Sequence, residues 1–274
     1  MACIPTPGSA LAIALTLLLA VPVHGTAADE IKIGGTGAGL GTMRLLADAF
    51  ARQVPEVNVS VPPSLGSSGG IRAVVGGALD IAVSSRPLKE DERKLGATEI
   101  EYGRTPFVFA VASKSKVTAI TNGQLADIYA GRLVNWPDGT RIRLVLRPAG
   151  ESDTAQVKSM SPDIGRALSE AEKRPGVPFA VSDQNAADDI EKIPGAFGAT
   201  TLALIASEKR ALRALTLDGV EPTPKNAASG AYPHFKTLFL VTGAKRSAPV
   251  QRFIAFVQSP AGREILARSG HWTP

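Results

Sequence analysis

The sequence repeats one arrangement several times: a short apolar segment, a loop of small residues, and a segment whose apolar residues recur at helical spacing. In the first copy the β-branched segment 31–33 leads into the glycine-rich bend 34–41, and the helical spacing begins at Leu40. The next copy has a predicted strand at 57–61 and a Ser/Gly loop at 64–70. This alternation predicts a parallel sheet with helices on both faces, whose ligands lie beyond the carboxyl ends of the strands.

Two long apolar segments, 105–112 and 235–242, are the natural places for the chain to cross between two lobes. A chain of 274 residues is long enough for such a division. We therefore expect an α/β fold of two lobes, each with a mixed, mostly parallel sheet and helices on both faces, with a ligand cleft between them. The expected lobe I is 29–108 with 241–274, and the expected lobe II is 109–240.

The N-terminal segment 1–28 contains no charged side chain, and an apolar run at 11–23 is followed by small residues. This pattern predicts a signal peptide that is cleaved near residues 25–28 and an exported, periplasmic protein, with an uncleaved anchor as the alternative. The sole cysteine, Cys3, lies in this segment. The processed chain is therefore expected to have no disulfide, no thiolate metal site and no cysteine nucleophile.

The charge pattern argues against a nucleic-acid partner. The formal net charge is +5, but no run of five Lys or Arg occurs, and aromatic residues make up only 5% of the chain. Evenly distributed positive charge predicts mild attraction to anions rather than a nucleic-acid groove. The bend at 34–41 contains neither a Gly-Lys-Ser/Thr sequence nor a Gly-x-Gly-x-x-Gly sequence, so it is neither a P-loop nor a dinucleotide-binding fingerprint.

The polar residues also argue against an enzyme. His234 and His271 are the only histidines after the predicted signal, and they are not at metal-ligand spacing. We expect His271 to lie on the surface and His234 to flank the second crossing strand. The acidic residues at 90–92 and 188–189 are expected to be solvated. The sequence therefore predicts no catalytic residues, no metal and no cofactor.

Four loops supply hydroxyl groups and backbone donors, and two of them also carry an arginine, Arg86 or Arg147. Each loop taken singly is most simply a structural turn. Taken together at the edges of two sheets, they can surround a tetrahedral oxyanion without a metal, with Arg147 offering a planar fork to two oxygens. The four loops are 34–41, 64–70, 84–88 and 148–154, and Arg147 directly precedes the last of them.

In these and other motifs the chain resembles the phosphate-binding, substrate-binding proteins of bacterial ABC transporters, which have the type II periplasmic-binding-protein fold. The resemblance covers almost all of the chain after the predicted signal, and the order and spacing of the motifs make it specific. The matching segments are 35–39, 66–71, 80–89, 125–131 with 135–136, Arg147 with 152–154, 194–198 and 259–262.

The resemblance implies an exported solute receptor that binds inorganic phosphate or a related oxyanion between its lobes and delivers it to an ABC permease in the inner membrane. It further implies a monomer without cofactor. A phosphate-sensing module of the same fold is one alternative, and an enzyme acting on a phosphorylated substrate is another. By position, the implied ligand residues are Thr36, Gly37, Ala38, Ser67, Ser68 and Ser85 from one lobe and Arg147, Ser152, Asp153 and Thr154 from the other.

Two positions depart from the family pattern and bear on which anion is bound. Phosphate-selective members have Asp where this chain has Ser85, and Gly where it has Asp153. A carboxylate accepts the proton of phosphate and repels sulfate, which has only acceptor oxygens at neutral pH. Asp153 is either the replacement acceptor or a residue that favours a helix N-terminus with its carboxylate in solvent.

Overall fold

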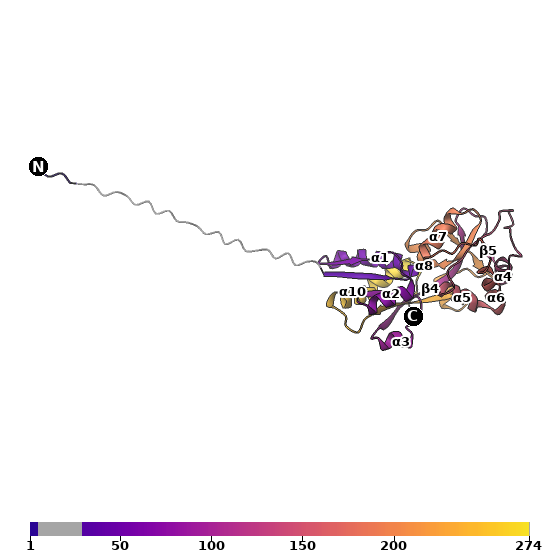
Figure 1. The fold of residues 1–274 in the computed structure, drawn as a ribbon. Coiled ribbons are helices and arrows are strands. Elements are labelled where there is room, and N and C mark those ends of the chain that lie inside the picture. The colour runs from indigo at the N-terminus through magenta and orange to yellow at the C-terminus, as the bar shows by residue number, and fades with distance from the viewer. Residues whose placement is uncertain (5–28, 274) are drawn as a thin grey trace.

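The computed structural model describes residues 1–4 and 29–273. Figure 1 shows two lobes, one built mainly from the two ends of the described chain, in indigo and yellow, and one from its middle. The predicted signal peptide, 1–28, lies outside the described residues apart from 1–4. Within the described ranges, no helix combines the length and the apolar character needed to cross a membrane.

The first lobe is organised around five strands whose order confirms the predicted mostly parallel start of the chain. β1 (Asp29–Gly35) is parallel to β2 (Val57–Ser60) and to β3 (Ile81–Ser84). β10 (Phe235–Thr242) is antiparallel to β3 and to β4 (Thr98–Ala112). The loops that leave Gly35 and Ser84 therefore begin at the same edge of the sheet. In spatial order the strands are β2, β1, β3, β10 and β4.

Helices cover both faces of this sheet. Ile81 and Val83 of β3 belong to one apolar cluster, while Ala82 between them belongs to another. Since successive residues of a strand point to opposite faces, the two clusters lie on opposite sides. The first side is covered by α1 (Gly37–Gln53), α10 (Ala248–Gln258) and α11 (Pro260–Arg268), the second by α2 (Gly66–Val75), and α3 (Glu90–Lys94) precedes β4.

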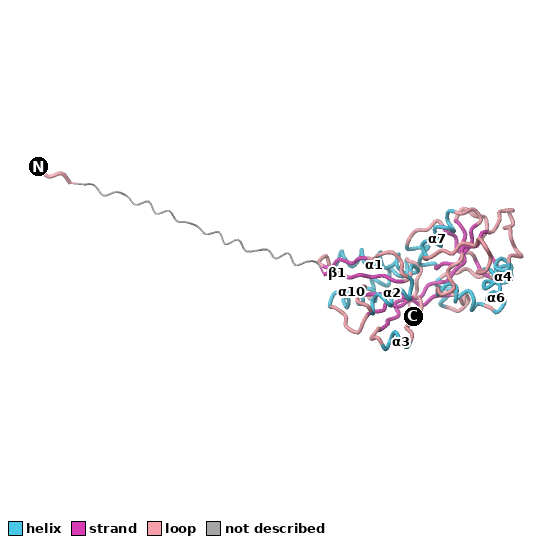
Figure 2. Tube along the Cα trace, in the orientation of Figure 1, coloured by secondary structure: helices cyan, strands magenta, loops and turns pink. Residues whose placement is uncertain are grey.

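The second lobe continues from the same long strand, β4. Its second half pairs antiparallel with β7 (Ala196–Thr201) and β8 (Leu212–Ala214), and β7 is parallel to β6 (Arg143–Val145). Two short strands, β5 (Ala119–Ile120) and β9 (Thr216–Leu217), form a separate parallel pair. Figure 2, in the same orientation, shows strands in both lobes with helices around them.

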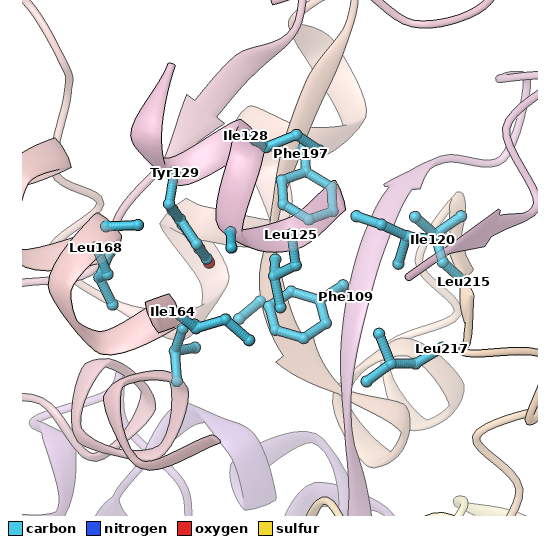
Figure 3. Close-up of a cluster of buried hydrophobic side chains, with 14 of the residues drawn as sticks. Phe109, Ile120, Leu125, Ile128, Tyr129, Ile164, Leu168, Phe197, Leu215 and Leu217 are labelled. Carbon is cyan, nitrogen blue, oxygen red and sulfur yellow. The ribbon is translucent and has the colours of Figure 1, made fainter. Parts of the chain in front are cut away.

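The core of the second lobe is built from aromatic and aliphatic side chains (Figure 3). Phe109 of β4 stacks on Phe197 of β7, with ring centroids 5.7 Å apart and planes 13° apart. Leu125 and Ile164 belong to the same cluster and come from two packed helices. The helices of this lobe are α4 (Asn122–Ala130), α5 (Ser152–Met160), α6 (Pro162–Ala171), α7 (Asp183–Lys192), α8 (Leu202–Ser207) and α9 (Pro224–Ala228).

The chain changes strand partner at the point where the two lobes meet. β4 pairs with β10 up to Pro106 and with β7 from Phe107 onward. The Phe107 N–H donates to the carbonyl of His234 at 3.0 Å, immediately before β10 begins. Strand pairing thus favours a point near residue 234 for the second crossing of the chain between the lobes. The predicted lobe division at 108/109 and 240/241 stays a prediction.

His271 contradicts the expectation of a surface residue. It is 2% exposed, and its Nε2 lies 2.9 Å from Oγ1 of Thr42 in α1. The neighbouring Trp272 forms a β-bridge with Arg104, which holds the C-terminal segment against the first lobe. Burial lowers the pKa of His271 to about 3, so this imidazole is neutral at physiological pH.

Candidate functional site

The first lobe contributes the loops after β1 and β3 and the first turns of α1 and α2. The Thr36 N–H donates to the carbonyl of Val83 at 2.9 Å, which ties the first loop to the end of β3. Gly35 permits this approach, because its φ is +120° and a Cβ would lie 2.8 Å from the Val83 nitrogen. α1 begins at Gly37, earlier than the predicted Leu40. The first N–H groups of a helix have no partner within it, so Gly37 and Ala38 offer backbone donors.

Two serines link the second and third loops of the first lobe. Ser67 lies in the first turn of α2, and its Oγ accepts from the Ser85 N–H at 3.0 Å. The two hydroxyl oxygens are 3.2 Å apart. Sequence reasoning placed both residues in the site, and the structure brings them together.

Arg86 and Ser68 belong to a separate set of hydrogen bonds that includes Glu92. Arg86 donates to both carboxylate oxygens of Glu92, at 2.6 and 2.8 Å, and to Oγ of Ser68 at 3.0 Å. The hydrogen bond from Arg86 is the main reason that the pKa of Glu92 is lowered to about 2. The expectation that Glu92 is simply solvated was therefore wrong, and the charge of Arg86 is already paired.

In the second lobe Arg147 follows β6 and is only 6% exposed. Its Nη1 donates to the carbonyl of Ala180, and its Nη2 lies 3.4 Å from a carboxylate oxygen of Glu151. Its Nε is buried without a hydrogen-bond partner. Thr154 donates its hydroxyl to the Arg147 carbonyl at 3.0 Å, so this predicted ligand residue also shapes the loop.

Lys236 in β10 was missed by sequence reasoning. It is 3% exposed and donates to Oγ of Ser152 at 2.9 Å and to the carboxylate of Asp153. Its Nζ also lies 5.3 Å from the ring centroid of Phe107. A lysine inside the apolar strand 235–242 was the available signal, since a charged residue is rarely buried unless it is paired.

Asp153 is 4% exposed, so the alternative in which its carboxylate faces solvent is wrong. Its carboxylate accepts from Lys236 and lies 3.9 Å from Nε of Arg147. Whether Asp153 discriminates between anions stays a prediction.

Asp183, in the first turn of α7, is the second residue that sequence reasoning missed. Its side chain is buried, and Oδ2 lies 3.5 Å from Oγ1 of Thr36 in the opposite lobe. Burial raises its pKa to about 6, with Asp153 adding to the rise and Arg147 and Lys236 opposing it. The signal was the segment Ser182-Asp183-Gln184, a polar loop that opens a helix as the other loops do.

The two lobes touch through these groups. Ser85 Oγ lies 2.8 Å from Ser152 Oγ, and Gln184 donates to the carbonyl of Gly37 at 3.2 Å. A cavity of about 460 Å³ adjoins the contact and is lined from both lobes, with Ser67, Ser68, Ser85 and Ser152 among its residues. In the part of the chain that the structure describes, no cluster of three or more His, Cys, Asp or Glu could hold a metal ion. The arrangement suits an anion held by hydroxyl groups, backbone N–H groups and one guanidinium.

Comparisons with known proteins agree with this architecture. A family model described as a PBP superfamily domain matches residues 20–261. The Phosphate-binding protein PstS of Borreliella burgdorferi is 27% identical over 213 residues, which cover 75% of this chain and 76% of the relative. The Phosphate-binding protein PstS of Bacillus subtilis is 25% identical over 244 residues, which cover 85% of this chain and 76% of the relative.

Solved structures share the fold at low sequence identity. A Clostridium perfringens structure, described as a phosphate ABC transporter substrate-binding protein with bound phosphate, has a TM-score of 0.76 at 23% identity, covering 90% of this chain and 100% of that one. The periplasmic molybdate-binding protein of Azotobacter vinelandii has a TM-score of 0.61 at 16% identity, covering 89% and 99%. With the family model matching most of its length, the chain belongs to the PBP superfamily.

Proposed function

We propose that this protein is an exported solute receptor that binds phosphate, or a similar tetrahedral oxyanion, between its lobes and delivers it to an ABC permease. The relatives named for phosphate binding support the ligand class, and the predicted signal supports a periplasmic location. The proposal is of a monomer that binds without chemical turnover. The ligand residues are those implied by the family motifs, with Arg147 as the charged anchor.

The observation that carries the proposal is the buried guanidinium of Arg147 with an unpartnered Nε. A buried donor without a partner is costly, and an anion oxygen is the partner that it suits best. The serine hydroxyls of both lobes meet nearby, at Ser85 and Ser152, and can rotate to donate to other oxygens.

The test is titration calorimetry with phosphate on protein that has been stripped of ligand by partial unfolding and then refolded. We expect one phosphate per chain and no heat of continued turnover. Replacing Arg147 with alanine removes a charge-assisted contact worth about 1.5–3 kcal/mol, so affinity is expected to fall by roughly 10–150-fold.

Arg263→Ala is the matched control, because it removes an exposed arginine of α11 in the first lobe. Circular dichroism checks that both variants keep the fold. An Arg147→Ala variant with the affinity of the parent would sink this site assignment. A parent that hydrolyses a phosphorylated compound, or that ignores phosphate, would count against the proposed function itself.

A further inference from the structure

An ion pair between Lys236 and Asp153 connects the two lobes beside the site. Lys236 pairs with Thr105 in the sheet of the first lobe, whereas Asp153 lies in the first turn of α5 in the second. Both side chains are almost completely buried. A buried charge is tolerated only when it is paired. Removing either partner would therefore leave the other charge buried and unpaired, which is costly.

The carboxylate of Asp153 has two cations within reach and bonds only one. Its Oδ1 accepts from Lys236, while its Oδ2 is 3.9 Å from Nε of Arg147, beyond hydrogen-bond distance. The nitrogen that would complete this second contact is the unpartnered Nε of Arg147. In the structure Lys236 has the hydrogen bond to this carboxylate, and Arg147 has only a longer ion pair with its other oxygen.

We propose that Lys236 is a positioning residue for anion binding: it holds the Asp153 carboxylate away from Arg147 and so leaves the guanidinium available to the ligand. Its bond to Ser152, 2.9 Å long, also orients a hydroxyl of the site. This inference rests on the proposed anion-binding function. It adds a residue of β10 to a site otherwise built from loops and helix N-termini.

Without Lys236 the Asp153 carboxylate would turn to Arg147 and compete with the ligand as an internal anion. Removing that carboxylate as well should therefore improve binding relative to Lys236→Met, although the lysine is still absent. A role limited to holding the lobes together predicts no such improvement. Rescue by the second substitution is the readout that separates the two explanations.

The experiment measures phosphate affinity by calorimetry for Lys236→Met, Asp153→Asn and the double variant. Methionine keeps the length and apolar character of the lysine stem, and Lys245→Met removes one positive charge at an exposed position as the control. We expect Lys236→Met to weaken binding at least about tenfold, as coupling between close charges implies. The double variant is expected to bind at least about threefold more tightly than Lys236→Met, and Asp153→Asn alone is measured to give what the carboxylate itself contributes to binding.

An unchanged affinity in Lys236→Met, or a double variant as weak as that single variant, overturns the inference while phosphate binding by the parent leaves the proposed function standing. If the single variant does not fold, the double variant decides. Binding close to that of Asp153→Asn supports the positioning role, and a tenfold or greater loss relative to Asp153→Asn overturns it.

Discussion

Replacing Asp183 with asparagine is expected to stabilise the protein at neutral and alkaline pH and to leave its stability at pH 4 nearly unchanged. The Asp183 carboxylate is buried between the lobes, where Asp153 and Glu151 raise its pKa further and Arg147 and Lys236 lower it. Burial is the largest cause. Asparagine has nearly the same shape, keeps an oxygen that can accept from Thr36, and carries no charge.

The magnitude follows from the shift of the Asp183 pKa from its ordinary value of 3.8 to about 6. Each pKa unit is worth about 1.4 kcal/mol, so the ionised carboxylate destabilises the native state by about 3 kcal/mol. Because the pKa is higher in the folded than in the unfolded protein, the native state binds this proton more tightly. The resulting stabilisation is complete below about pH 4 and is lost as the pH rises through about 6.

The assay is urea unfolding of parent and variant between pH 4 and pH 8 in the absence of ligand. The difference in unfolding free energy between Asp183→Asn and the parent should grow from near zero at pH 4 to about 3 kcal/mol at pH 8. Asp91→Asn, at an exposed position of α3, is the control and should show no comparable growth. A difference that does not change with pH would refute the reasoning, because the stabilisation would then not come from the charge.

Two further predictions concern packing. In Gly37→Ala the new Cβ would lie 2.7 Å from Oδ2 of Asp183, so we expect a loss of about 1–3 kcal/mol and lobes that stay further apart, seen as a larger radius of gyration in small-angle scattering with phosphate. A variant that compacts with phosphate as the parent does would contradict this. Tyr232→Phe deletes the buried hydrogen bond of 2.8 Å to the Phe107 carbonyl and should cost about 0.5–1.5 kcal/mol in thermal unfolding, and an unchanged melting temperature would count against it.

The secondary structure could be predicted wherever the signal is local. The predicted strand at 235–242 has the bounds of β10, and α4 is delimited by local signals, with Thr121 accepting from the Gln124 N–H and Gly131 in the left-handed conformation. The strand at 105–112 was predicted too short, because β4 begins at Thr98. In its first half charged residues alternate with apolar ones, a pattern typical of a surface segment. The pairing with β10 makes this half part of the sheet.

The loop residues of the candidate site could be predicted from the sequence, whereas the buried charged residues Lys236 and Asp183 could not. Ser67 and Ser85 were expected and do meet, because loops at the carboxyl ends of neighbouring strands share an edge, and Ser152 meets Ser85 across the two lobes. Lys236 and Asp183 were missed because their partners are distant along the chain, 83 residues for Lys236 with Asp153 and 147 for Asp183 with Thr36. No spacing rule connects residues so far apart.

By itself, the sequence determined the alternation of strands and helices, the glycine-rich starts of α1 and α2, and the membership of Arg147 in a polar loop after a strand. Those features depend on backbone conformation and on neighbours within a few residues. Only the tertiary structure decided that Lys236 bonds to Asp153 more closely than Arg147 does, that Asp183 is buried between the lobes, and that His271 packs against α1. Burial and ion pairing depend on which side chains the fold brings together, and that is set by the packing of the whole chain.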